Sequence, residues 1–239
     1  MNDVAYPQVE TQQQDALVIA IDGPSGSGKS STARGVAQRL GLAYLDTGAM
    51  YRAITVAYLR SGLAADDAGG IARLADEAEL TVTDDPASPA IALDGQDVTE
   101  EIREPRVSQH VSVVATNAHV REVLTDQMRA LVEAADQRIV VEGRDITTVV
   151  WPDAEVRVLL VADPKARIQR RKAELAGAAS HDEVHDQVVR RDRDDATVSE
   201  FATPAQGVSL VDSTHLSLEQ VIDTICSFVP TSQPPTPQE

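Results

Sequence analysis

The sequence is poor in cysteine and aromatic residues, and it lacks long apolar runs. Its single cysteine, Cys226, cannot form a disulfide within the 239-residue chain, which favours a reducing compartment. Cys226 lies in an apolar helical pattern, so we expect it to be buried as a small hydrophobe. No run of about 18 apolar residues occurs, and none is therefore expected to cross a membrane. Residues 1–15 lack the features of a secretion signal, so we expect a cytoplasmic protein.

Positive charge is also scarce. The chain carries 21 Lys and Arg against 38 Asp and Glu, which gives a formal net charge of −17. Such a charge repels nucleic-acid phosphates and argues against DNA or RNA as a partner. Any anionic substrate must therefore be gathered by a local cluster of arginines. The hydrophobic content of 42% is typical of a globular protein with a substantial core.

The strongest motif is a glycine-rich turn at residues 23–30. It reads Gly-Pro-Ser-Gly-Ser-Gly-Lys-Ser, which fits the P-loop pattern at every position, and it lies between an apolar run and a helical pattern. In that context backbone N–H groups bind the phosphates of a nucleoside triphosphate. Lys29 is expected to bridge the β- and γ-phosphates, and the Ser30 hydroxyl to hold Mg²⁺. The expected nucleotide-binding residues are Gly23, Pro24, Ser25, Gly26, Ser27, Gly28, Lys29, Ser30 and Ser31.

Short apolar stretches alternate with helical patterns along the chain. This alternation predicts an α/β fold, with a five-stranded parallel sheet covered by helices on both faces. The expected strands are 17–21, 42–45, 139–142, 156–161 and 208–211, and the clearest helical patterns are 29–40, 48–60, 118–135, 164–175 and 217–228.

Two stretches interrupt the alternation. Residues 78–100 contain two short alternating runs and an Asp94-Gly95 turn signal, which predict a small antiparallel patch within an insert at about 63–107. Residues 176–200 are polar and then strongly charged, and they predict a mobile lid at about 165–200. We expect one domain at 16–229, between flexible tails at 1–15 and 230–239.

Arginines follow two of the expected strands. Arg52 lies in a helical pattern that opens at Asp46 after the second strand, and Arg144 directly follows the third. Ligands of open α/β sheets bind beyond the carboxyl ends of the strands, where arginines are suited to bidentate phosphate contacts. Surface ion pairs are the alternative for both arginines, and a helix N-cap is the alternative for Asp46.

Together these motifs resemble the bacterial cytidylate kinase family. The resemblance is carried by residues 21–30, 45–52, 142–150, 190–195 and 212–214, and it covers roughly residues 16–228. It implies a P-loop nucleoside-monophosphate-kinase fold in which the insert binds substrate and the lid closes. It also implies transfer of a phosphoryl group from ATP to CMP or dCMP with Mg²⁺. Separately, we expect the chain to be a monomer.

The resemblance further implies an acceptor site. Asp145 takes the position of a residue that accepts from the 4-amino group of cytosine, which uracil lacks. Ser112 and Arg121 take the other base-contact positions, and Asp195 a ribose contact. The residues expected to bind the acceptor are Thr47, Arg52, Ser112, Arg121, Arg144, Asp145, Arg191 and Asp195, and those expected to act in catalysis are Lys29, Arg144 and Arg191.

Further charged residues are candidates for the same chemistry. Arg167, Arg170 and Arg171 share one face of the helix that leads into residues 176–200. There they either supply charge to the transferred group or form a solvated basic face. Glu142 is a candidate outer ligand of Mg²⁺.

The sequence departs from the family pattern three residues after Asp195. The family arginine expected there is replaced by Val198, and Arg193 is the best candidate to compensate for it. The alternative is that Arg193 only offsets its acidic neighbours.

Two other functions fit a P-loop. A regulatory GTP switch is disfavoured because the guanine-reading N-K-x-D motif is absent, and the D-x-x-G match at 66–69 follows no buried strand. A P-loop kinase of another nucleotide, shikimate or gluconate is the alternative within enzymes.

Overall fold

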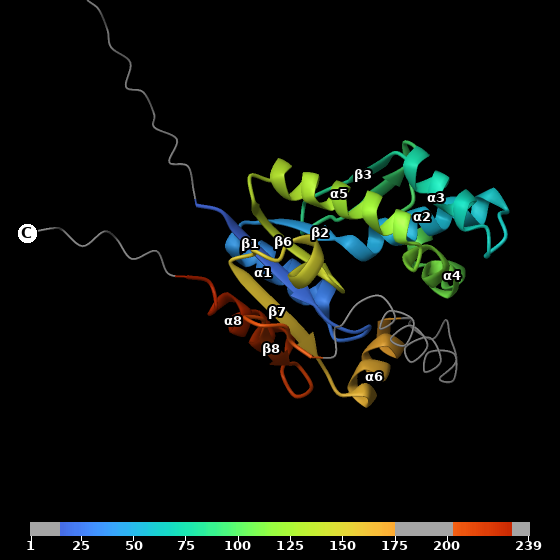
Figure 1. The fold of residues 1–239 in the computed structure, drawn as a ribbon. Helices are drawn as coiled ribbons and strands as arrows, with labels where there is room; N and C mark the ends of the chain where they lie inside the picture. Colours follow the sequence, from blue (N-terminus) through green and yellow to red (C-terminus); the bar gives the residue numbers. More distant parts are fainter. Residues whose placement is uncertain (1–14, 175–202, 231–239) are drawn as a thin grey trace, which may run out of the picture.

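The computed structural model describes residues 15–174 and 203–230, and it contains a five-stranded parallel sheet (Figure 1). The strand order is β2-β6-β1-β7-β8. Each of the five predicted strands is present, with ends that differ from the prediction by at most one residue. Their bounds are β1 Leu17–Asp22, β2 Ala43–Asp46, β6 Arg138–Gly143, β7 Val156–Val161 and β8 Ser209–Asp212.

Both faces of the sheet are buried, as the apolar strands predict. On the central strand β1, Val18 and Ala20 join one core cluster, whereas Ile19 and Ile21 join the other. Successive side chains of a strand point to opposite faces, so four consecutive apolar residues place a core on each side. In Figure 1, α5 and α8 lie on opposite sides of the sheet.

Each core cluster includes helices that the sequence patterns predict. The first cluster includes side chains of α2 (Thr47–Ser61), α4 (Pro105–Ala115) and α5 (Ala118–Ala134). The second includes side chains of α1 (Lys29–Leu40) and α8 (Leu218–Cys226). The first cluster also includes Ile71 and Ala75 of α3 (Ala68–Glu77), and a further helix is α6 (Pro164–Glu174). The sequence did not predict α3 or α4.

Cys226 differs from its prediction because it is only partly buried. It is the last residue of α8, and the helix buries Val221, Ile222 and Ile225 against the sheet instead. Burial still raises the pKa of the Cys226 thiol.

The predicted antiparallel patch is confirmed. It consists of β3 (Leu80–Val82), β4 (Ile91–Leu93) and β5 (Gln96–Asp97). Asp94 and Gly95 join β4 to β5 with φ angles of 51° and 74°, the positive pair that a tight hairpin turn requires. The loop between β3 and β4 is fastened to the main sheet, because the Tyr44 N–H donates to the Asp84 carbonyl at 2.8 Å.

Several predicted features lie outside the described residues. They include most of the predicted lid and nearly all of both tails, together with Arg191, Arg193, Asp195 and Val198. Within 15–174 and 203–230, no helix combines the length and apolar character needed to cross a membrane.

Candidate active site

The glycine-rich motif forms the turn between β1 and α1, as predicted. Gly23 has a φ of 152°, and a Cβ atom there would lie 2.1 Å from the Leu160 carbonyl oxygen. Gly28 precedes α1 with a φ of 92°. Glycine is therefore required at both positions. The motif ends at the N-terminus of α1, where free N–H groups and the helix dipole favour an anion.

Two arginines of α6 contact this turn. Arg167 donates to the Ser25 carbonyl at 3.1 Å. Arg170 donates to the Ser27 carbonyl at 3.2 Å and to the Ser213 hydroxyl and carbonyl at 2.9 and 2.6 Å. Neither arginine belongs to a solvated face, so that alternative is wrong for both. Positive charge is thereby held against the carbonyl side of the P-loop.

A buried carboxylate lies beside Ser30 and Lys29. Glu142, the residue before the last of β6, is 3% exposed, and Tyr44 donates to it at 3.1 Å. Burial and the nearby Asp46 carboxylate raise the pKa of Glu142, while Lys29 and a hydrogen bond with Ser30 oppose this rise. A hydroxyl and two carboxylates thus gather at the start of α1. Oxygen donors of this kind suit a hard cation such as Mg²⁺.

Asp46 also has a structural role. Its carboxylate accepts from the Ala49 N–H at 3.0 Å and so caps the N-terminus of α2. The predicted N-cap alternative is therefore confirmed. The same helix carries Arg52, which reaches the cavity described below.

A second buried carboxylate joins the P-loop to the loop after β6. Asp22, which is 3% exposed, accepts from the N–H groups of Ile146 and Thr147, each at 2.8 Å. The Thr147 hydroxyl donates to it at 2.6 Å. These bonds hold the start of the π-helical turn η2 (Ile146–Val150), directly after Arg144 and Asp145. No sequence pattern singled out Asp22 as a functional residue, although an acidic residue ending an apolar strand is an unusual feature.

The predicted acceptor residues fall into two groups. Asp145, 8% exposed, forms an ion pair with Arg121, whose guanidinium lies 6.0 Å from the Tyr51 ring centroid. Arg144 instead donates to the Gly23 carbonyl of the P-loop. The structure therefore brings the predicted base contacts Asp145 and Arg121 together, and it holds Arg144 against the P-loop.

The other predicted acceptor residues lie around these groups. Thr47 is buried and donates to the Glu142 carbonyl at 2.8 Å, which joins α2 to β6. Ser112 is half-buried on α4, in the turn before Ala115, whose carbonyl accepts from Arg121 at 3.2 Å.

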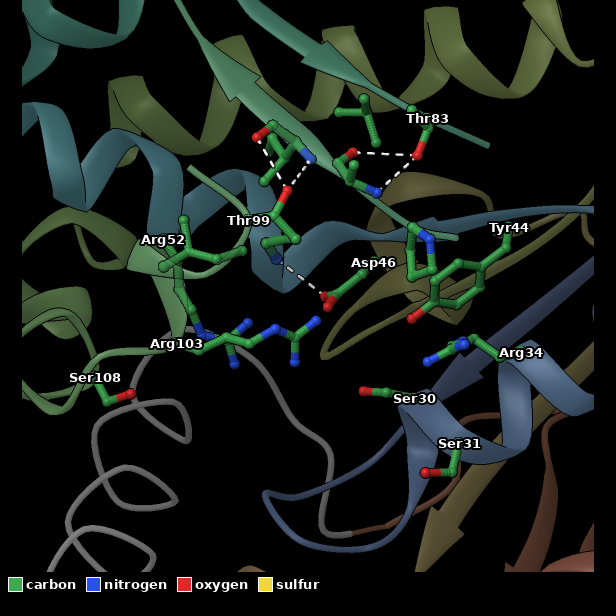
Figure 2. A pocket seen from close by; sticks show the side chains of 16 residues that line it. Ser30, Ser31, Arg34, Tyr44, Asp46, Arg52, Thr83, Thr99, Arg103 and Ser108 are labelled. Atoms are coloured by element: carbon green, nitrogen blue, oxygen red, sulfur yellow. Dashed lines mark hydrogen bonds between the residues drawn. The ribbon is translucent and has the colours of Figure 1, made fainter. Parts of the chain in front are cut away.

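A cavity of about 400 Å³ opens between the start of α1 and the antiparallel insert, and we call it the insert cavity (Figure 2). Its lining includes three arginines, from α1, from α2 and from the 3-10 turn η1 (Glu101–Arg103). Ser112, Arg121 and Asp145 are not among its described lining residues. The charged and hydroxyl side chains at its wall include Ser30, Arg34, Asp46, Arg52, Arg103 and Ser108.

A second cavity, of about 310 Å³, lies on the other side of the P-loop, and we call it the α8 cavity. Ser27, Gly28 and Arg170 line it together with Ser213, Leu216 and other residues near the start of α8. Ser31 lines both cavities. One phosphate-binding turn thus separates two spaces, as a reaction between two bound molecules requires.

An open parallel sheet with a P-loop on its central strand, an antiparallel insert and a cavity on each side of the loop defines a P-loop kinase. The family profile described as cytidylate kinase matches residues 19–231. The chain belongs to the cytidylate kinase family.

Curated relatives agree with this membership. The cytidylate kinase of Cutibacterium acnes is 57% identical over 217 residues, covering 90% of this chain and 96% of the relative. The cytidylate kinase of Streptomyces coelicolor is 44% identical over 216 residues, covering 90% and 93%. A solved structure of an uncharacterized protein from Eubacterium ventriosum aligns with a TM-score of 0.50 at 11% identity, covering 89% of this chain and 98% of that one. That last likeness concerns the fold alone.

Proposed function

We propose that this chain transfers the γ-phosphoryl group of ATP to CMP or dCMP and releases ADP with CDP or dCDP. The observation that carries the proposal is the P-loop placed between two cavities, one of them lined by three arginines. The curated relatives cited above are named cytidylate kinases, which supports the same reaction.

The P-loop and its neighbours bind the donor. Backbone N–H groups of residues 25–31 surround the ATP phosphates, and Lys29 bridges the β- and γ-phosphates. The α8 cavity, with apolar residues such as Leu216 and Val221, suits the donor base. Ser30 would hold Mg²⁺, with Asp46 and Glu142 as outer acceptors. Mg²⁺ would supply charge that offsets the negative charge on the transferred group.

Residues beyond the strand ends bind the acceptor. Asp145, oriented by its ion pair with Arg121, accepts from the 4-amino group of cytosine. Arg52 and Arg144 bind the acceptor phosphate. Ser112 and Thr47 complete the contacts, and Arg191 and Asp195, which the family resemblance suggests, add a phosphate and a ribose contact.

The reaction needs no strong general base. A nucleoside monophosphate is already close to dianionic at neutral pH, because its second pKa is about 6. Its oxygen attacks the γ-phosphorus in line, so the protein acts by positioning and by stabilising charge. Lys29, Arg144 and Arg191 act on that charge in this mechanism.

A coupled assay across CMP, dCMP, UMP, AMP, shikimate and gluconate tests the proposal. CMP and dCMP should give the highest kcat/KM, with UMP and AMP clearly lower. A higher kcat/KM for shikimate, gluconate or another nucleotide would overturn it. We also propose a cytoplasmic monomer, which light scattering during gel filtration would test for the oligomeric state.

A further inference from the structure

We propose that Arg103 of the antiparallel insert binds the phosphate of the acceptor nucleotide. This inference rests on the proposed function and adds a binding residue that neither the motif nor the family resemblance singled out.

The charges around Arg103 are paired in a way that leaves its guanidinium for a ligand. On the same turn, the Glu101 carboxylate accepts from Arg60 at 2.5 Å and from Arg106 at 2.6 Å. Glu104 is also taken, since Arg106 donates to it at 2.6 Å. Within residues 15–174 and 203–230, the exposed Arg103 side chain forms no hydrogen bond and no ion pair.

Arg103 and Arg52 both line the insert cavity. In Figure 2 their side chains point into the cavity on the side opposite Arg34. Arg52 likewise forms no side-chain hydrogen bond or ion pair with any described residue. Arg34 differs, because it donates to the Pro86 carbonyl at 2.9 Å. Two unpaired guanidinium groups at one cavity repel each other unless an anion lies between them.

The position of the cavity indicates which anion this is. Ser30, at the start of α1, lines the same cavity. The cavity therefore reaches the phosphate-binding N-terminus of α1, next to the transferred γ-phosphoryl group. A phosphate monoester is close to dianionic at neutral pH and accepts paired hydrogen bonds from planar guanidinium groups. The acceptor phosphate therefore satisfies both arginines and lies where transfer occurs.

The test compares Arg103→Ala with Arg106→Ala. Arg106 is a matched control because it is also exposed, lies three residues away and pairs with acids rather than lining the cavity. Titration calorimetry of each protein would use CMP and cytidine, which differ only by the phosphate. Arg103→Ala should weaken CMP binding roughly 10- to 100-fold and leave cytidine binding unchanged, as expected for one charge-assisted contact. Arg106→Ala should change neither, and Arg103→Lys should restore part of the loss.

Three results would overturn the inference. They are unchanged CMP binding in Arg103→Ala, an equal loss for CMP and cytidine, and wild-type CMP binding no tighter than that of cytidine. Measuring the turnover of CMP as well as its binding distinguishes a failure of this inference from a failure of the proposed function. If the wild-type protein fails to phosphorylate CMP while Arg103→Ala still weakens CMP selectively, the phosphate contact stands and the proposed reaction falls. If CMP is phosphorylated and the CMP-to-cytidine ratio is unchanged, the reaction stands and the role of Arg103 falls.

Discussion

Around the α8 cavity, the phosphate-binding groups come from consecutive residues of one turn, held by the backbone of 23–30 and by two arginines of α6. The arginines of the insert cavity come instead from α1, α2 and η1, which are far apart in the sequence. The first side depends on local backbone geometry, whereas the second depends on the insert being folded and docked. A substitution beside the α8 cavity should therefore affect only nearby contacts. A substitution beside the insert cavity should also affect residues that are distant in the sequence.

Among substitutions in the P-loop, Lys29→Ala should have the largest effect on turnover. The ammonium group acts mainly on charge that moves in the transition state, so kcat should fall roughly 10²- to 10³-fold or more. The thermal unfolding midpoint should change little, because Lys29 is only half-buried. Most of the wild-type turnover in a folded variant would count decisively against phosphoryl transfer at this site.

Asp145→Asn tests the predicted contact to the acceptor base, which lies outside the described lining of the insert cavity. The substitution removes the negative charge and the ion pair with Arg121, and it replaces one acceptor oxygen with an amide NH₂ that can donate to the uracil 4-carbonyl. Discrimination between CMP and UMP, measured as a ratio of kcat/KM values, should relax by about 1–3 kcal/mol. Equal losses for both nucleotides would mean that Asp145 acts on another part of the site, for instance by ordering Arg144.

Glu142→Gln tests whether the buried Glu142 carboxyl makes the stability of the protein depend on pH. Burial raises the pKa of Glu142, so the folded protein holds this proton more tightly than the unfolded chain does. The wild-type free energy of unfolding should then fall as pH rises above about 4.5, the usual glutamate pKa. The amide side chain of the variant cannot ionise, so urea unfolding between about pH 4.5 and pH 8 should show the variant gaining stability relative to wild type. An unchanged difference across that range would contradict the raised pKa.

The smallest expected effect concerns Arg193. If it replaces the arginine missing at Val198, Arg193→Ala should raise the KM for CMP several-fold and leave the KM for ATP nearly unchanged. Steady-state kinetics with each substrate varied in turn would measure both. A silent Arg193→Ala, together with tighter CMP binding in Val198→Arg, would mean that the phosphate clamp is one arginine short in this chain.

The sequence predicts the regions whose structure is set by near neighbours in the chain. Apolar runs define the five strands, the glycine pattern defines the P-loop, and Asp46 marks the start of α2. The helix α3 was missed because it starts with Ala-Gly-Gly, and glycine disfavours helices, although Asp67 caps it. The helix α4 was missed despite Pro105 at its first turn, a known start signal.

Side chains that act through tertiary contacts could not be predicted in this way. Arg103 lines the insert cavity without an ion pair to any described residue, whereas Arg106 pairs with Glu101, a carboxylate that Arg60 of α2 also contacts. Asp22 receives its hydrogen bonds from residues more than 120 positions away. No local pattern carries that information.

Two sets of hydrogen bonds join the P-loop to the segment after β6. Ile146 and Thr147 donate to the Asp22 carboxylate, and Arg144 donates to the Gly23 carbonyl. If ATP binding shifts the P-loop, these bonds would carry the shift to the segment with Arg144 and Asp145. The affinities for the two substrates would then be coupled rather than independent. By thermodynamic reciprocity, whatever factor ATP applies to the affinity for the acceptor, the acceptor applies to the affinity for ATP.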